Sequence, residues 1–254
     1  EHFEKLIKTN PNAFVSITHI SNAFGKIHDI KNIIKLAHDY KAVVMIDAAQ
    51  SLAHFKIDVQ ELDVDFFAIS GHKTFAPTGV GAIYVKEQFL KEIKPYQTGG
   101  ATIHEVDFSG STLLDSPYKF EAGTQNIAGI IGFGKAIEYI NHVKYENIES
   151  IENKIYKYLD EELAKISGII FYNDITDSIG SRSFNFEGII HDDIGILLDK
   201  MGIAVRVGHH CAQPIMKKLG IKGTIRVSTA FYNDYVDVDK LIVSLKKALR
   251  MLKD

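Results

Sequence analysis

The sequence has little cysteine, tryptophan or proline and no long apolar run, and each shortage narrows the class of protein. Its 254 residues include one cysteine, no tryptophan and five prolines. A single cysteine cannot form a disulfide within the chain, which favours a reducing compartment such as the cytoplasm. No apolar stretch approaches the roughly 20 residues of a membrane span, and the first residues lack the basic and apolar parts of a signal peptide. We expect a cytoplasmic protein with no membrane partner.

The charge and composition are those of an ordinary globular protein. The formal net charge is −3, hydrophobic residues make up 46% and charged residues 24%. A weakly acidic chain has no bulk attraction to nucleic acid or to anionic membranes. The length suits one large domain or two modest ones, so we expect an α/β protein that binds small molecules or proteins.

The first part of the chain alternates apolar strands with a helical pattern. A helix is expected at 27–40, and strands are expected at 13–18, 42–46, 64–69 and 82–85. Such alternation predicts a mainly parallel sheet, whose ligands bind at the carboxyl ends of the strands. Between residues 89 and 126, glycines, prolines, serines and threonines indicate loops or a hairpin.

The second part of the chain predicts a smaller α/β unit. A helical pattern runs from 127 to 166, with a possible break, and is followed by strands at 169–172, 182–187, 203–207 and 224–229 and helices at 192–201, 213–219 and 236–252. We place the domain boundary near residue 140, which divides the chain into domains at 1–140 and 141–254.

Lys73 follows an apolar strand in the segment Ser70-Gly71-His72-Lys73. A lysine after a strand is usually solvent-exposed, but here a hydroxyl, a glycine and an imidazole precede it, and these groups suit a phosphate. A desolvated lysine near cationic groups becomes a usable nucleophile. The segment therefore predicts a lysine that forms a Schiff base.

Asp47 ends the preceding apolar strand, in Asp47-Ala48-Ala49-Gln50. On its own such a carboxylate could merely cap a turn. Two small residues after it would let a flat ring approach the backbone, and Gln50 could bond a ring substituent. A buried Asp47 beside a pyridine nitrogen would stay ionised. Asp47 and Lys73 at the ends of neighbouring strands are what a pyridoxal phosphate site requires.

Cys211 lies in His209-His210-Cys211, shortly before Pro214. It could be a small buried hydrophobe, or a metal ligand together with the two histidines, although adjacent ligands are not the usual zinc spacing. We favour a third interpretation, in which Cys211 precedes a helix N-terminus whose dipole and the neighbouring imidazoles favour the reactive thiolate.

Arg226 lies inside an apolar strand, where an arginine is rare unless it is paired. No partner is evident, so a bidentate substrate carboxylate is a reasonable guess. Asn22 follows the first strand and could add hydrogen bonds, although an asparagine there is more often a turn residue.

Taken together, these segments resemble the cysteine desulfurases of aminotransferase class V, and most of all the group II, SUF-type enzymes that supply sulfur for iron–sulfur cluster assembly. The resemblance rests on His19-Ile20-Ser21-Asn22, Asp47-Ala48-Ala49-Gln50-Ser51, Ser70-Gly71-His72-Lys73, Gly79-Val80-Gly81, Phe120-Glu121-Ala122-Gly123-Thr124, Arg206-Val207-Gly208-His209-His210-Cys211-Ala212 and Ile225-Arg226-Val227-Ser228. It implies a fold type I transferase: a partial large domain and a C-terminal small domain. The N-terminal third of such enzymes is expected to be absent.

The resemblance also implies roles for these residues. Lys73 would hold pyridoxal 5'-phosphate and act as general base, and Cys211 would take sulfur from L-cysteine as a persulfide, releasing L-alanine. The remaining implied contacts are Asp47 to the pyridine nitrogen, Gln50 to the ring oxygen, Ser70 and His72 to phosphate, Thr124 to the partner subunit's phosphate, and Arg226 with Asn22 to the substrate carboxylate.

Two partners are implied as well, a second copy in a homodimer and a sulfur-acceptor protein of the SUF system. Residues 96–124 would lie near the dimer interface. Selenocysteine lyase activity is an alternative, because the same attack can be made on selenium. A second alternative is a non-catalytic fragment that keeps only docking and dimerisation surfaces.

Overall fold

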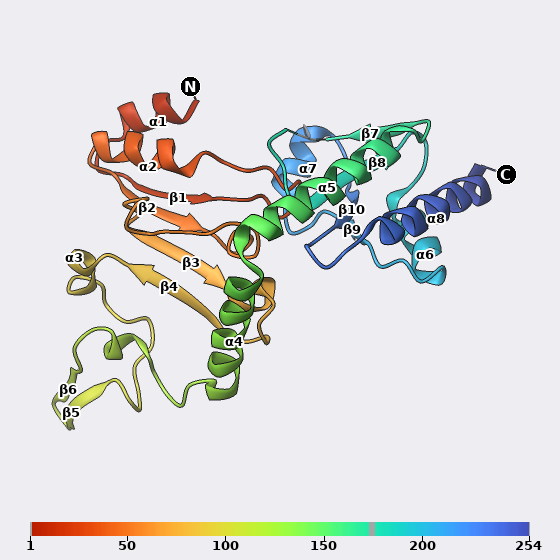
Figure 1. Ribbon diagram of the computed structural model, residues 1–254. Helices are drawn as coiled ribbons and strands as arrows, with labels where there is room; N and C mark the ends of the chain where they lie inside the picture. The colour runs from red at the N-terminus through yellow and green to blue at the C-terminus, as the bar shows by residue number, and fades with distance from the viewer. Residues whose placement is uncertain (1, 173–175, 254) are drawn as a thin grey trace. The chain divides into compact units, whose positions relative to one another are not determined.

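The computed structural model describes residues 2–172 and 176–253 and divides the chain into two compact units (Figure 1). The first unit comprises Glu1–Thr18, Asp29–Ala53 and Ile57–Ile140. The second unit comprises His19–His28, His54–Lys56 and Asn141–Asp254. Two short segments that precede residue 140 thus have their contacts in the second unit. The division into domains at 1–140 and 141–254 stays a prediction.

The first unit is built on a four-stranded sheet of order β1-β2-β3-β4. Strands β1 (Phe14–Thr18), β2 (Val43–Asp47) and β3 (Phe66–Ser70) are parallel, whereas β4 (Gly81–Val85) is antiparallel to β3. Strand β4 reverses because only a short connection precedes it, and parallel neighbours require a long crossover. The predicted α/β sheet with mainly parallel strands is confirmed.

Two helices cover one face of this sheet. Helix α1 (His2–Thr9), which the sequence analysis did not predict, and helix α2 (Ile30–Asp39) pack on β2 and β3 through Ile7, Ile34, Val44 and Ile46. Helix α2 begins at residue 30 rather than 27, because the Asp29 carboxylate accepts the Asn32 N–H at 3.1 Å and caps it there.

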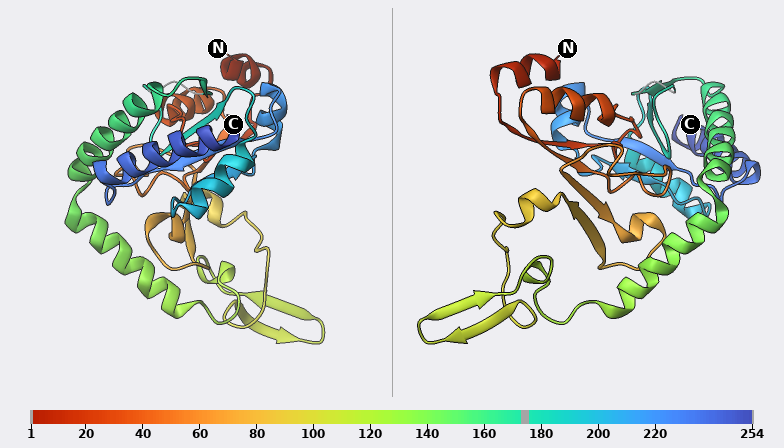
Figure 2. Two further views of the ribbon diagram at one scale, coloured as in Figure 1. Left: turned by 90° about the vertical axis from the view of Figure 1, so that its right-hand side faces the viewer. Right: turned by 60° about the vertical axis from the view of Figure 1, so that its left-hand side comes forward.

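The stretch between the sheet and the long helices forms a hairpin, as predicted. After α3 (Glu87–Leu90), strands β5 (Ile103–Asp107) and β6 (Gly110–Leu113) pair antiparallel and project from the rest of the first unit (Figure 2). The predicted break in the helix that follows is also found. Helix α4 (Ile127–Val143) ends and α5 (Tyr145–Ala164) begins at Lys144, whose φ of 71° is incompatible with a helix.

The second unit is an antiparallel sheet with helices on one face. Its strands are β7 (Ile169–Phe171), β8 (Ser181–Phe186), β9 (Arg206–Gly208) and β10 (Thr224–Ser228), in the order β7-β8-β10-β9. Helices α5, α6 (His191–Lys200) and α8 (Tyr235–Lys253) supply the core partners of this sheet, among them Leu159, Leu198 and Leu245. The 19–28 segment and α7 (Gln213–Leu219) form a separate apolar cluster through Ala23, Phe24 and Met216.

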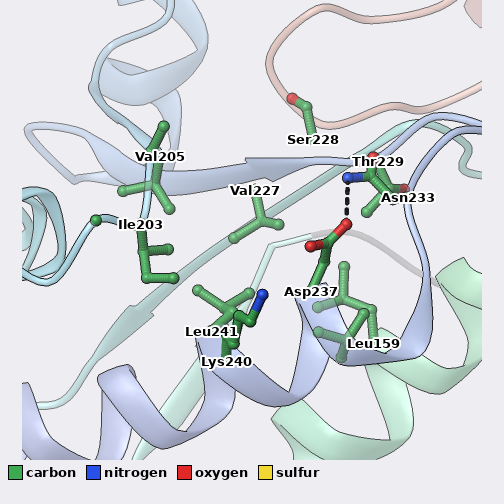
Figure 3. Close-up of a pocket in the computed structure, with 13 residues that line it drawn as sticks. Leu159, Ile203, Val205, Val227, Ser228, Thr229, Asn233, Asp237, Lys240 and Leu241 are labelled. Atoms are coloured by element: carbon green, nitrogen blue, oxygen red, sulfur yellow. Dashed lines mark hydrogen bonds between the residues drawn. The ribbon is translucent and has the colours of Figure 1, made fainter.

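Strand β9 begins at residue 206 rather than 203, because residues 203–205 do not pair with β10. A cavity of about 270 Å³ lies there, and its walls include Val205, Val227 and Leu241 (Figure 3). Asp237 lies at the same cavity and accepts a hydrogen bond from Asn233 at 3.1 Å. None of the site residues predicted above lines it. Among the described residues, no helix is long and apolar enough to cross a membrane.

Candidate active site

Lys73 lies in a short 3₁₀ turn, Gly71–Thr74, directly after β3. Two local bonds fix this turn. The buried Thr74 hydroxyl donates to the Ser70 carbonyl at 3.1 Å, and the Phe75 N–H donates to the Gly71 carbonyl. Phe75 needs a left-handed conformation, with φ of 62°, to make its bond. The position of Lys73 is therefore set by residues within three positions of it.

Gly71 lets this turn approach the next loop closely. Its N–H donates to the Val80 carbonyl at 2.9 Å, and a Cβ built on Gly71 would lie 2.7 Å from the same oxygen. Any larger residue would push the turn away from residue 80 and displace the lysine. This explains the glycine in Ser70-Gly71-His72-Lys73 without reference to a ligand.

Asp47 and Ser70 end neighbouring parallel strands. Because Asp47 is in register with Ala68 of β3, both residues lie at the carboxyl edge of the sheet. Asp47 is exposed rather than buried as expected, and its carboxylate accepts the Ala49 N–H at 3.0 Å. Gln50, in the turn after β2, is half-buried.

The strand-end cluster, which we define as Asp47, Gln50, Ser70, His72 and Lys73, has the donor set that pyridoxal phosphate requires. The Ser70 hydroxyl and His72 Nδ1 are 3.2 Å apart, next to a half-buried Lys73. Within residues 2–172 and 176–253, the Lys73 ammonium has no hydrogen bond or ion pair. An unengaged amine, a carboxylate, a hydroxyl and an imidazole fit an aldehyde, a pyridine nitrogen and a phosphate.

Thr124 is exposed and lies in the stretch before α4. The neighbouring Gly123 N–H donates to the Gly100 carbonyl at 2.8 Å, which ties this stretch to the loop before the hairpin. No described contact joins Thr124 to the strand-end cluster of this chain. Its role toward the phosphate of a partner subunit stays a prediction.

Cys211 lies in the second unit, at the end of a strained loop of residues 208–211. Gly208, His210 and Cys211 have φ values of 105°, 52° and 58°. A left-handed conformation costs a non-glycine residue on the order of 1–3 kcal/mol, so neighbouring groups must hold the loop. The exposed Cys211 precedes helix α7, as predicted, and its N–H donates to His209 Nδ1 at 3.2 Å.

The loop is held at His210 from two sides. The Asn22 side-chain amide donates to the His210 carbonyl at 2.6 Å, and His210 Nε2 lies 2.9 Å from the Thr224 hydroxyl. The imidazole is buried. Burial lowers the pKa of His210 to about 4, with a smaller contribution from Arg226, so the ring is neutral near pH 7.

Arg226 lies beside this loop on β10. Its Nη1 donates to the Asn22 carbonyl at 2.6 Å, a partner that the sequence did not reveal. Burial and Arg206 lower the pKa of Arg226, while Cys211 acts in the opposite direction. Arg206 stands directly opposite Arg226 in the register of β9 and β10. Sequence reasoning missed Arg206 as a site residue, because only the strand register brings the two guanidinium groups together.

The side chains of the alternative metal site differ in their surroundings. The His210 ring contacts Thr224, whereas Cys211 is exposed. In the part of the chain that the structure describes, no group of three or more histidine, cysteine or acidic side chains could hold a metal ion.

The chain thus carries two clusters of functional side chains, an unengaged lysine at strand ends and an exposed cysteine in a loop near Arg226. The family model for aminotransferase class V matches residues 1–241, and the chain belongs to this family. Its fold is accordingly the aminotransferase fold, with a partial large domain. The expected family of aminotransferase class V and the expected fold class are confirmed.

Three similar proteins sharpen this result. A cysteine desulfurase of Wigglesworthia glossinidia brevipalpis is 42% identical over 98% of this chain and 61% of its own length. The crystal structure of Escherichia coli cysteine desulfurase CsdA, in an S-sulfonic acid form, has a TM-score of 0.93 and 38% identity, over 98% of this chain and 62% of that one. The apo cysteine desulfurase of Thermococcus onnurineus NA1 also has a TM-score of 0.93, with 39% identity over the same shares. The chain thus spans about three-fifths of the length of these relatives.

Proposed function

We propose that this chain carries the cofactor lysine and the sulfur-accepting cysteine of a cysteine desulfurase, which converts L-cysteine to L-alanine. The observation that carries the proposal is that one chain holds an unengaged Lys73 at strand ends and, in its other unit, an exposed Cys211 in a strained loop near Arg226. The 42%-identical relative with this activity supports it.

Pyridoxal 5'-phosphate would be held by the strand-end cluster, with Lys73 at its aldehyde, Asp47 at its ring nitrogen and Gln50 at its ring oxygen. Ser70 and His72 would bind the phosphate, and Thr124 would bind the phosphate of a partner subunit. When bound, the cofactor supplies an electron sink that makes the Cα proton of an amino acid acidic.

The side chains of this protein would do the rest. The Lys73 amine takes the Cα proton, and Arg226, with Asn22, binds the substrate carboxylate. Nη1 of Arg226 already donates to the Asn22 carbonyl, which leaves its other donors for the substrate. Cys211 Sγ, as the thiolate, would then attack the substrate sulfur: a new S–S bond forms, the substrate Cβ–S bond breaks, its electron pair stays with Cβ, and a proton added there completes the methyl group of alanine.

We further propose membership of the group II, SUF-type enzymes, because Cys211 follows two histidines in a short loop. A homodimer, a sulfur-acceptor protein, a role in iron–sulfur cluster assembly and a cytoplasmic location belong to the same proposal. It would fail at the level of the group if the chain passed sulfur equally well to unrelated thiols and to acceptor proteins of the SUF type.

The test is to mix the purified chain with pyridoxal phosphate, reduce with borohydride and map the adduct by peptide mass. We expect one adduct on Lys73 and alanine release when L-cysteine is added before reduction. Lys73→Ala should lose both, whereas Lys91→Ala, at an exposed lysine of the same unit, should lose neither. An adduct spread over surface lysines, in a folded protein, would overturn the proposal.

A further inference from the structure

We propose that Asn22, His210 and Thr224 are positioning residues, which hold the Cys211 loop in its left-handed turn so that the thiol stays in the positive field of Arg226. This inference deepens the proposed function and rests on it for the role of Cys211 as nucleophile. All of the groups involved belong to the second unit.

The first anchor is the carbonyl that joins His210 to Cys211. It accepts the Asn22 amide N–H at 2.6 Å, across 188 residues of sequence. Because both residues of this peptide have positive φ, a free loop would relax toward ordinary conformations. The Asn22 side chain, which is proposed to bind the substrate carboxylate, thus also holds the nucleophile loop.

The second anchor is the His210 ring. It is 6% exposed, and its only described partner is the Thr224 hydroxyl at 2.9 Å, on a residue that is fully buried. A buried neutral imidazole with one hydrogen bond adds no charge to the site, so its contribution lies in where it places the next residue. That residue is Cys211.

Asn22 connects the cysteine loop to Arg226. Its amide holds the cysteine loop, while its carbonyl accepts Nη1 of Arg226 at 2.6 Å. Cys211 acts to raise the pKa of Arg226, as a neighbouring thiolate does, and Arg226 stands opposite Arg206 in the register of β9 and β10. One residue therefore fixes both the thiol and the cation beside it, and a sulfur nucleophile held in this way favours anionic reagents.

The test compares alkylation of Cys211 by iodoacetate, an anion, and by iodoacetamide, its neutral counterpart. Cys211 is the one cysteine of the sequence, so no other thiol reacts. The ratio of the two rate constants measures the field at the thiol and is independent of overall reactivity. Arg226→Gln calibrates the loss of the field.

Thr224→Val should lower this ratio roughly fivefold, about the effect of one charge interaction across several ångströms of partly screened medium. Thr224→Ser keeps the hydroxyl and should retain the wild-type ratio. In Asn22→Ala the ratio should decrease as much as in Thr224→Val. Thermal unfolding of each variant identifies any that fails to fold. If folded Thr224→Val and Asn22→Ala both keep the wild-type ratio, the positioning role is wrong.

This experiment needs neither cofactor nor turnover. If no adduct forms on Lys73, the proposed function is contradicted, but the alkylation ratio of Cys211 is unaffected. Conversely, a chain that forms the adduct and releases alanine, but shows no change of ratio in folded Thr224→Val and Asn22→Ala, refutes only the positioning role.

Discussion

The strand-end cluster and the cysteine loop are built by different means. Lys73 is fixed by bonds among Ser70, Gly71, Thr74, Phe75 and Val80, all within seven residues of it. The cysteine loop is fixed by Asn22, which is 188 residues from His210 in sequence. A cluster set by local turns and strand ends is robust to distant change, whereas one set by long-range bonds depends on the whole unit.

The sharpest test of this comparison is to remove one functional atom from each cluster. Lys73→Ala should abolish the borohydride adduct and lower alanine formation by at least about a thousandfold. Cys211→Ala should leave the adduct intact and abolish both the transfer of sulfur and the alanine formation that accompanies it. Adduct mapping and alanine assays on the same samples separate the two, and loss of the adduct in Cys211→Ala would contradict the independence of the clusters.

The next largest effect concerns the hydrogen-bond network of Asp65, the residue before β3 in the first unit. Asp65, which is buried, accepts bonds from Lys86 at 2.8 Å, His38 at 2.9 Å and the Val44 N–H at 2.8 Å. Asp65→Ala would remove the acceptor of these donors and should reduce the free energy of unfolding by about 3 kcal/mol. Urea denaturation measures this.

The matched control for Asp65 is an exposed ion pair of the same unit. Lys31→Met removes the 3.0 Å pair with Glu61, both of which are exposed, and should cost less than about 1 kcal/mol. Equal losses in the two variants would mean that the buried network adds nothing beyond surface charge.

A smaller change tests the local origin of the Lys73 position. Gly71→Ala places a Cβ within 2.7 Å of the Val80 carbonyl and should cost about 1–3 kcal/mol and slow adduct formation. Gly134→Ala, where a Cβ would meet nothing within 4 Å inside α4, should be neutral or slightly stabilising. An unchanged rate of adduct formation in Gly71→Ala would contradict the conclusion that neighbouring residues fix the position of Lys73.

The smallest predicted difference is a response to acid in the second unit. Burial, with His28, lowers the pKa of His19 from 6.5 to about 4, and burial lowers that of His210 equally. Between pH 6.5 and 4 the unfolded chain binds more protons at these sites, so stability falls as the pH falls. Burial raises the pKa of Asp160 to about 6, and this carboxyl opposes them below pH 6. In this pH range the unfolded second unit therefore binds about one proton more than the folded unit does.

The stability of the first unit also falls as the pH falls, but in a lower pH range. Burial raises the pKa of Asp65, yet bonds from Lys86, His38 and Val44 outweigh burial and lower it overall. Its contribution is present above its ordinary value of 3.8 and is lost only below that. Hydrogen exchange at pH 7 and pH 5, corrected for intrinsic rates, should show faster opening in the second unit. Equal acceleration in both units would contradict this prediction.

What the sequence predicts follows the same division between local and long-range structure. Periodicity and glycines predicted the strands, the hairpin and a possible break in the long helix, which the structure places at Lys144, because each depends on neighbouring residues. The reversal of β4, the opposition of Arg206 to Arg226 and the Asn22 contact to His210 could not be predicted, because each depends on register or on long-range packing. Asp47 was expected to be buried and is exposed.

The most direct test of the account is the mass of the Cys211 peptide after the chain, with pyridoxal phosphate, has been given L-cysteine. The account predicts one added sulfur atom on this peptide, removable by a reductant, formed together with alanine and absent in Lys73→Ala. Alanine formed with no sulfur on Cys211 would contradict it, because the strained thiol beside Arg226 would then not be the acceptor.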